Sequence, residues 1–388
     1  MDTRPHTPQE APSLDAYLGK LNPIPLNGRY PDQKRLADWA AGAFDWLYQG
    51  DPLAEDAALA LRQSGGRGNV ADRIQQLATQ GDPACAALLT DMHDIPDWVD
   101  FDLMRRGGAM AQRHFPMLVL ALTYGCMPLT FAHPDAAEVF ASTGRLEANI
   151  ARRLNESGTL FFGVCNSDAL APGKHMWEAC VQVRLVHAIV RMSLIERGWN
   201  VAERGVPISQ LATAAGPAFF GTHLLGCLRR VGARITEEEA EGHCMIWRYT
   251  TRLLGVPQEL LGNTQAEQDE IDLNMSSLFF APDDTARVIM AALIRELAVQ
   301  QPTARIPAFL QLALFRRMLG DEMANAYGIP ESHKGERLLG GLDVLLSGYG
   351  RLQGLNPLAG LLRRRGQQII ERFGTEGLVS LDVAGTRH

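Results

Sequence analysis

The chain lacks the paired cysteines that a disulfide framework or a cysteine-ligated zinc site needs. It has six cysteines among 388 residues, and no two of them form a C-x-x-C pair. Most stand in apolar surroundings; they are Cys85, Cys126, Cys165, Cys180, Cys227 and Cys244. We therefore expect them to be small buried hydrophobic side chains rather than bridges or metal ligands.

Positive charge is also scarce. The 37 Lys and Arg residues are outnumbered by 44 Asp and Glu, so the formal net charge is -7 and the pI is about 5.8. No long Lys/Arg tract supplies a local basic surface. Because phosphate backbones are bound through clustered positive charge, nucleic-acid binding is disfavoured.

Signatures of several common enzyme classes are missing. The sequence has no Walker A loop, no G-x-S-x-G elbow, no H-E-x-x-H and no G-x-G-x-x-G. No Glu is followed three residues later by His, which excludes the Glu-x-x-His pairs of helical di-iron sites. Asp283 and Asp284 lack the third carboxylate of an isoprenoid cyclase motif, and His93 and Asp94 lack the flanking histidines of a metal phosphohydrolase. We interpret the latter two as a surface pair.

A convincing membrane span or signal peptide is absent too. The longest uncharged run, residues 115–132, has about the minimum length for a span, but Pro116 and Pro128 interrupt it. We expect it to be a buried core helix or tunnel wall. The first residues show no cationic, apolar signal, so the chain as supplied is expected to be cytoplasmic, and secreted only if a signal was removed.

Helical signals dominate what is present. Strand-like alternation of Val, Ile, Thr or Tyr does not persist for five residues. Segments rich in Ala, Leu, Arg, Glu and Gln predict helices over 33–48, 55–63, 71–90, 102–113, 135–165, 175–197, 209–231, 236–254, 257–274, 284–300, 303–318 and 357–373. Asp135 and Thr236 stand where helix N-caps are needed. These patterns predict an all-α fold.

No composition break divides the chain convincingly, so the sequence predicts one helical domain with peripheral ends. Residues 1–32 carry a high density of proline and are expected to form an extended arm over the body. The helical domain then spans 33–375, and residues 376–388 form a tail.

The predicted helix 175–197 carries the most informative histidine. On a helix, Arg184 lies three residues before His187 and Arg191 four residues after it, on one otherwise apolar face. Arginine is rarely buried without an anion, and the two propionates of a haem would supply one. Nearby cations would also depress the pKa of the imidazole and favour the neutral form that ligates iron. A core histidine bonded to a carbonyl is the alternative.

The same residues resemble the latex clearing protein (rubber oxygenase) family, which includes the fungal oxygenase of mycophenolic acid biosynthesis. The resemblance covers about residues 90–260. It rests on five segments in order: Asp94-Ile-Pro-Asp-Trp-Val-Asp100; Thr143-Gly-Arg-Leu146 with Arg152-Arg-Leu-Asn-Glu-Ser157; Arg184-Leu-Val-His-Ala-Ile-Val-Arg191; Gly205-Val-Pro-Ile-Ser-Gln210; and Trp247-Arg-Tyr-Thr-Thr-Arg-Leu-Leu-Gly-Val256.

The resemblance implies a single all-α domain with a globin-like core that encloses haem b. It makes His187 the proximal iron ligand, and it places Arg184 near the haem and Arg153 on the distal side. His187, Arg184 and Arg191 are the expected cofactor-binding residues, and Arg153 is one of the expected catalytic residues. The implied activity is a dioxygenase reaction that cleaves a C=C bond of a hydrophobic isoprenoid or polyisoprene-like substrate with O2, giving an aldehyde and a ketone.

One position departs from the rubber-cleaving pattern. Those members carry a distal Lys-Thr pair, where this chain has Glu156 and Ser157. Serine keeps the hydroxyl, but glutamate reverses the charge. The change puts in doubt that a lysine occupies the sixth position of the resting iron, and it also puts in doubt that polyisoprene is the substrate. The catalytic glutamate upstream of Arg153 has two candidates, Glu138 and Glu147.

Two other functions are compatible with these residues. A haem-binding sensor or carrier would keep His187 without oxygenase turnover, and the change at Glu156 is its best argument. A structural helical protein without a cofactor is the third reading. A visible absorption spectrum separates the third from the others, and O2 consumption with a polyene separates the first from the second.

Overall fold

The computed structural model describes residues 11–21, 23–24, 28–65, 69–142, 158–299, 303–341 and 364–368, and these contain helices and loops but no strand. The α-helices are α1 (Leu14–Leu18), α2 (Gln33–Ala43), α3 (Pro52–Ser64), α4 (Val70–Thr79), α5 (Pro83–His93), α6 (Phe101–Arg113), α7 (Phe115–Ala121), α8 (Pro134–Ser142), α10 (His175–Glu196), α11 (Val201–Arg204), α12 (Gln210–Thr213), α13 (Leu224–Arg230), α14 (Glu237–Leu253), α15 (Gln265–Phe279), α16 (Asp284–Val299), α17 (Ala308–Leu319) and α18 (Asp321–Ala326). The predicted all-α fold class is confirmed.

Shorter helical segments join these helices. Two are π-helical, η3 (Leu122–Cys126) and η6 (Pro217–His223). Five are 3-10 turns, η2 (Phe44–Tyr48), η4 (Met127–Phe131), η5 (Ser167–Leu170), η7 (Gln258–Leu260) and η8 (Thr303–Arg305). Residues 158–163, 333–341 and 364–368 are also α-helical. Because π-helical turns are rare and often occur at functional sites, η3 and η6 draw attention to the interior that they line.

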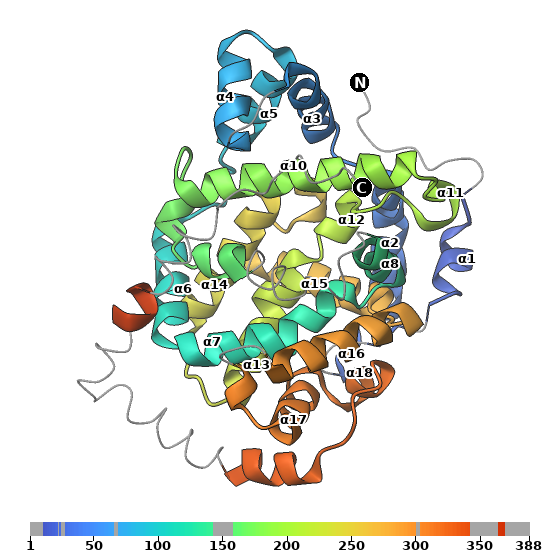
Figure 1. Ribbon diagram of the computed structural model, residues 1–388, viewed down its shortest axis with the longest axis vertical. Helices are drawn as coiled ribbons and strands as arrows, with labels where there is room; N and C mark the ends of the chain where they lie inside the picture. The colour runs from blue at the N-terminus through green and yellow to red at the C-terminus, as the bar shows by residue number, and fades with distance from the viewer. Residues whose placement is uncertain are drawn as a thin grey trace.

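Helix α10 separates a small bundle from the rest of the molecule. Figure 1 shows α3, α4 and α5 on one side of α10, while α6, α7, α13, α14 and α15 lie on the other. Helices α3 and α4 both contact α10. Side chains of α10 therefore face two environments, and residues of α3 and α5 can reach it from outside the main core.

Helix α14 packs most closely against α6, and glycine explains why. A Cβ at Gly107 would meet the backbone of Gly242 and His243, and one at Gly242 would meet the carbonyl of Leu103. The two backbones can approach this closely because neither glycine carries a side chain. Thr236 begins α14 with a capping box in which its hydroxyl accepts from the Glu239 amide, so the predicted N-cap is confirmed.

Two sequence predictions in this part of the fold are wrong. The segment 71–90 is two helices, because Asp82 caps a new helix that begins at Pro83. Asp135 is not an N-cap: helix α8 already begins at Pro134, and the Asp135 carboxylate accepts hydrogen bonds from Tyr17 and Arg204 instead.

The long apolar run 115–132 lies in the core as predicted. It forms α7, η3 and η4, and Leu118, Tyr124 and Phe131 in it are buried. Among the described residues, one helix, Gln210–Arg230, is long and apolar enough to cross a membrane, and 67% of its most apolar window is buried inside the fold. The bent pair formed by α6 and residues 115–131 passes the same test only if its 89° bend is ignored.

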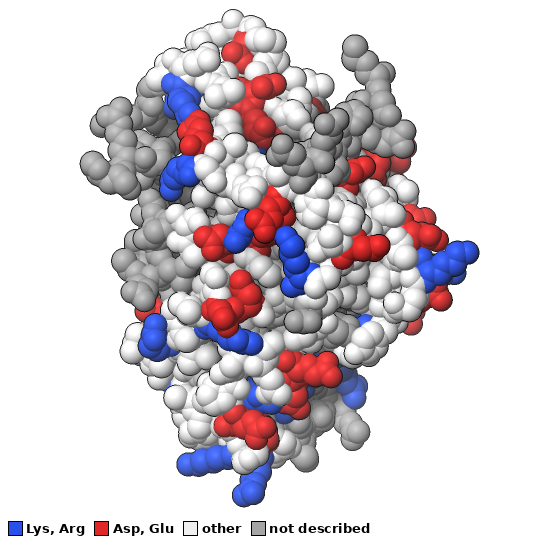
Figure 2. Space-filling view, turned by 90° about the vertical axis from the view of Figure 1, so that its right-hand side faces the viewer, with Lys and Arg blue, Asp and Glu red and all other residues white. Residues whose placement is uncertain are grey.

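The surface and the cysteines also agree with the sequence. All six cysteines are buried and unpaired. Figure 2 shows acidic and basic side chains interspersed over the face it presents, with no continuous basic stripe. His93 donates through Nδ1 to the Leu89 carbonyl at 2.7 Å, and the Asp94 side chain is 78% exposed, as expected for a surface pair.

Candidate functional site

Helix α10 brings the predicted ligand and both predicted arginines onto one element. It runs for 22 residues from His175, and most of its buried side chains are apolar. Trp177, in its first turn, donates through Nε1 to the carbonyl of Met92 at 3.0 Å and so joins α10 to α5. Arg184 and Arg191 are 2% and 3% exposed, which confirms that both arginines are buried.

Arg184 donates to two carboxylates of the small bundle. Its Nε and Nη2 reach Asp51 at 2.6 and 3.1 Å, and its Nη1 reaches Asp91 at 2.6 Å. Asp51 is also the N-cap of α3, where its Oδ1 accepts from the amide of Ala54. A charge-assisted two-point contact of this kind fixes direction as well as distance, so Arg184 aligns α10 with the start of α3.

Arg191 makes an equivalent contact one turn further along α3. Its Nη1 donates to Glu55 at 2.8 Å, while Nε and Nη2 donate to the carbonyls of Pro207 and Ile208 at 3.1 and 2.5 Å. Ile208 has φ 52°, the one non-glycine residue with positive φ in the described part of the chain. The guanidinium thus holds a strained backbone turn against α10.

Helix α14 joins the same network through Arg252. Its Nη2 donates to Asp91 at 2.8 Å, so Asp91 lies between Arg184 and Arg252. These two arginines keep the pKa of Asp91 below its usual value although burial acts in the opposite direction. We call Asp51, Glu55, Asp91, Arg184, Arg191 and Arg252 the α10 clamp.

The α10 clamp accounts for the burial of Arg184 and Arg191 without a cofactor. The anions that compensate Arg184 and Arg191 are carboxylates of the protein itself, so their burial does not require a ligand. Their assignment to a cofactor stays a prediction, and their observed contacts brace α10. Sequence reasoning missed Asp51, Glu55 and Asp91. Asp51 before Pro52 carries the signature of a helix start, but nothing in the sequence pairs these acids with α10.

His187 lies between the two arginines on α10. Its Nδ1 is buried and has no hydrogen-bond partner. Burial, and to a smaller extent the charge of Arg191, lowers the pKa of His187 to about 4, while Asp51 acts in the opposite direction. The imidazole is therefore neutral at pH 7, as the sequence predicted for a residue with nearby cations.

Three other histidines share a buried, unpartnered Nδ1 but differ at the second ring nitrogen. His114 Nε2 lies 3.1 Å from the Arg234 carbonyl, and His243 Nε2 lies 3.0 Å from the Phe220 carbonyl. His223 Nε2 lies 3.3 Å from the sulfur of Cys227. Within the described ranges, His187 is the histidine of this group whose imidazole is not already held by a protein atom.

The predicted catalytic residues are Arg153, Glu156, Ser157, Glu147 and Glu138. Arg153, Glu156, Ser157 and Glu147 lie outside the described residues. Glu138 is on α8, where its Oε1 accepts from the hydroxyl of Ser142 at 3.2 Å.

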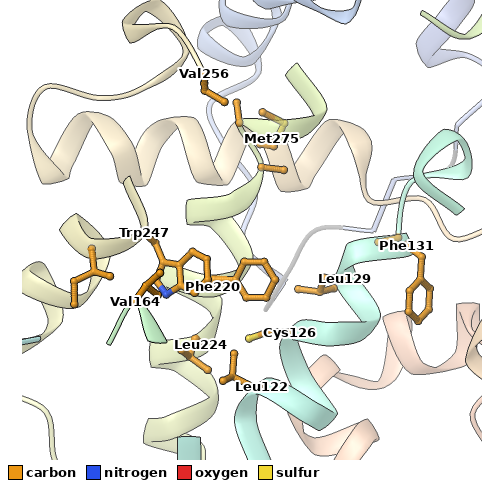
Figure 3. Close-up of a cluster of buried hydrophobic side chains, with 14 of the residues drawn as sticks. Leu122, Cys126, Leu129, Phe131, Val164, Phe220, Leu224, Trp247, Val256 and Met275 are labelled. Carbon is orange, nitrogen blue, oxygen red and sulfur yellow. The ribbon is translucent and has the colours of Figure 1, made fainter. Parts of the chain in front are cut away.

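A buried apolar cluster lies in the interior beside the π-helical segments. Phe220 of η6 stacks on Trp247 of α14, with ring centroids 4.6 Å apart. Figure 3 shows these two rings together, with Leu122 and Cys126 of η3 nearby. Cys126 donates through its thiol to the Phe219 carbonyl at 3.0 Å, which ties η3 to η6. Buried clusters of this kind are more often simple core than the wall of a ligand site.

The residues on α10 fit the requirements of an axial haem ligand. Iron binds neutral imidazole, and the His187 imidazole is neutral and partly buried, and its Nδ1 does not bond any protein atom. Its helix is fixed on both sides of the histidine by the α10 clamp. In the described residues no cluster of three or more His, Cys, Asp or Glu could hold a metal ion by itself. A porphyrin supplies four of the iron ligands, so one histidine is enough.

Comparisons with known proteins agree with this fold. The family model "ER-bound oxygenase mpaB/B'/Rubber oxygenase, catalytic domain" matches residues 77–350, a longer span than the 90–260 of the sequence resemblance. A rubber oxygenase of Streptomyces sp. (strain K30) is 24% identical over 278 residues, which are 68% of this chain and 64%, less than two thirds, of that protein. Latex clearing protein LCP in the closed state matches with a TM-score of 0.61 at 18% identity, over 84% of this chain and 91% of that one. The last likeness shows the fold alone.

Proposed function

We propose that this chain, which belongs to the family of the ER-bound oxygenase mpaB/B' and rubber oxygenase catalytic domains, is an oxygenase that holds haem b through His187. The observation that carries the proposal is the state of that side chain. It is neutral at pH 7, its Nδ1 is buried without a partner, and it lies on a helix that two ion-paired arginines, Arg184 and Arg191, hold in place.

The α10 clamp has a specific part in this proposal. When bound, haem b supplies the redox-active iron that chemistry with O2 requires. Arg184 and Arg191 hold the backbone on both sides of His187 by donating to Asp51 and Glu55. Ligands need a fixed orientation as well as the right donor atom, and groups outside the ligand set commonly supply it. We therefore propose Arg184 and Arg191 as residues that position the ligand.

The proton chemistry is assigned to the distal residues. Arg153 and the Ser157 hydroxyl would donate hydrogen bonds on the distal side, and a carboxylate would remove a proton from an allylic carbon of the substrate. Glu138 and Glu147 are the candidates for that carboxylate, with Glu156 as a proton shuttle. The single variants Glu138→Gln and Glu147→Gln show which of the two glutamates is the base. The variant that lacks the base should lose most of its turnover, while the other variant should keep it.

The proposed substrate is a hydrophobic isoprenoid. Family membership and the buried aromatic and aliphatic interior formed by η3, η6 and α14 support this class. Addition of both atoms of O2 across one C=C bond, with cleavage of that bond, gives one aldehyde and one ketone from a trisubstituted alkene. No external electron donor is consumed in this overall reaction.

Oxygen consumption tests the proposal directly. The purified protein should consume O2 when a polyisoprenoid is added, and one aldehyde and one ketone should form for each O2 consumed. A haem-binding sensor or carrier would show a haem spectrum without substrate-dependent O2 uptake. Absence of both the spectrum and the uptake after incubation with haemin would contradict the proposal.

A further inference from the structure

The N-terminal segment, expected to be an extended arm over the body, carries a buried tyrosine. Tyr17 of α1 is 4% exposed. Its ring packs against Phe44, with centroids 5.5 Å apart, and lies parallel to the ring of His133 at 6.3 Å. Helix α1 itself is only five residues long, so its position depends on such contacts rather than on its own helical stability.

The Tyr17 hydroxyl belongs to a hydrogen-bond chain of defined direction. The amide of Asp135 donates to His133 Nδ1 at 3.1 Å, so Nδ1 carries no proton and the neutral ring is protonated at Nε2. His133 Nε2 therefore donates to the Tyr17 oxygen at 3.0 Å. The Tyr17 hydroxyl in turn donates to Asp135 Oδ2 at 3.1 Å. Each member thus fixes the hydrogen position of the next.

The surroundings keep this chain in its neutral-histidine form. Burial lowers the pKa of His133, against the charges of Asp135 and Asp283, while Arg204 adds to the lowering. Burial raises the pKa of Asp135, but His133, Arg204 and Tyr17 oppose it. Arg204 also donates to Asp135 Oδ1 at 3.3 Å. Removing the tyrosine hydroxyl would leave a largely buried imidazole N–H and a carboxylate oxygen without their partner.

A second anchor joins the same segment to the same place. The amide of Ile24 donates to the carbonyl of Phe280 at 2.7 Å. Ala281, the residue after Phe280, donates through its amide to the carbonyl of Ala132 at 2.9 Å. Ala132 and His133 directly precede α8. Both contacts of the N-terminal segment therefore converge on the start of that helix.

We propose that residues 13–21 and 23–24 form a strap that positions helix α8, and that the Tyr17 hydroxyl is its positioning contact. Asp135 lies in the first turn of α8, and Glu138 lies three residues further along the same helix. Loss of the Tyr17 contact frees the first turn and lets the Glu138 carboxylate move. The strap does not depend on the proposed function. The effect of the strap on turnover does depend on the proposed function, because it requires Glu138 to be the base.

Hydrogen exchange of the full-length protein tests the strap, with Tyr17→Phe as the variant and Tyr48→Phe as its control. Both tyrosines pack on Phe44, but the Tyr48 hydroxyl donates to the Ala202 carbonyl at 3.4 Å and makes no hydrogen bond with α8. Tyr17→Phe should raise amide exchange over 135–142 about tenfold, because one hydrogen bond to a charged group is lost. Exchange over 175–196 should not change.

The control decides between a local and a general effect. Equal exchange over 135–142 in Tyr17→Phe and in the unmodified protein would overturn the proposal, as would an equal increase in Tyr48→Phe. The kcat and KM of the haem-loaded Tyr17→Phe variant then test Glu138 separately. A lower kcat at unchanged KM supports Glu138 as the base. Faster exchange with unchanged kcat keeps the strap and removes Glu138 from the proposed machinery.

Discussion

Asp272 is a buried carboxyl group without an ion-pair partner among the described residues. It is 4% exposed, and its two oxygens accept from Gln268 Nε2 and Thr222 Oγ1, each at 2.7 Å. Burial raises the pKa of Asp272 to about 7, although both hydrogen bonds and Arg248 lower it. The bond to Thr222 links α15 to η6, the π-helical segment that contributes Phe220 to the interior.

We predict that Asp272→Asn stabilises the protein at pH 8. The folded pKa is higher than the unfolded value of about 4, so the contribution of this group to stability is present below pH 4 and is lost as the pH rises through 7. Asparagine carries no charge and can still pair with Thr222. The melting temperature of Asp272→Asn should exceed that of the unmodified protein at pH 8 and match it near pH 4.

Asp38→Asn is the control, because Asp38 is exposed on α2 and its charge is not among the causes that shift the pKa of Asp272. Its melting temperature should follow the unmodified protein at both pH values. A destabilised Asp272→Asn variant at pH 8 would show that the ionised carboxylate is favourable in the fold.

Arg184 and Arg191 should differ in their contribution to stability. Arg184→Met leaves the buried Asp51 without its ion pair, which should lower the free energy of unfolding by about 3 kcal/mol. Arg191→Met leaves Glu55, whose side chain is 28% exposed and can be hydrated, so the loss should be about 1–2 kcal/mol. Urea unfolding measures both values.

An exposed ion pair gives the reference for that comparison. Arg105→Met removes a contact with Asp168 in which both side chains are about half exposed or more, and it should cost less than 1 kcal/mol, of the order usual for surface pairs. Equal losses for Arg184→Met and Arg105→Met would mean that the α10 clamp contributes no more than a surface contact.

At the level of elements, the approach of α14 to the clamp depends on one glycine. Gly255, just after α14, has φ +93°, and a Cβ there would meet the carboxylate of Asp51 and the guanidinium of Arg184. Gly320, before α18, has a similar φ of +84° but nothing within 4 Å of its Cβ position. The two positions therefore separate backbone strain from steric conflict.

We predict that Gly255→Ala destabilises the protein more than Gly320→Ala. The control should lose about 1 kcal/mol from positive φ alone. Gly255→Ala should lose at least about 2 kcal/mol more, because the Asp51 to Arg184 contact must shift. Thermal or urea unfolding of the two variants measures the difference, and equal losses would contradict the tight packing around Asp51.

The order of the helices could be predicted from sequence, but several of their ends could not. The apolar and capping patterns gave α6, α10, α14 and α16 to within about a residue or two. They missed the break at Asp82 and Pro83, since a short turn between two apolar helices leaves the 3.6-residue pattern almost unchanged. They also placed a cap at Asp135, whose carboxylate is taken by Tyr17 in a contact between residues more than 100 positions apart.

For the whole molecule, the sequence indicated the chemistry of the site better than its contacts. His187 could be chosen because two arginines flank it at helical spacing, and the structure confirms that all three lie on one continuous helix. The identity of the compensating anions could not be predicted, because Asp51, Glu55 and Asp91 come from α3 and α5, and their pairing depends on how the small bundle docks on α10. Long-range pairing of this kind leaves no local pattern.

The visible absorption spectrum of the unmodified protein and of His187→Ala tests the central claim most directly. After incubation with haemin and removal of the excess, the unmodified protein and the control His175→Ala should both show a Soret band and about one haem per chain. His187→Ala should show neither, because it lacks the one strong bond between protein and iron, while its far-UV circular dichroism stays unchanged. A full Soret band in His187→Ala, or none in the unmodified protein, would contradict the account.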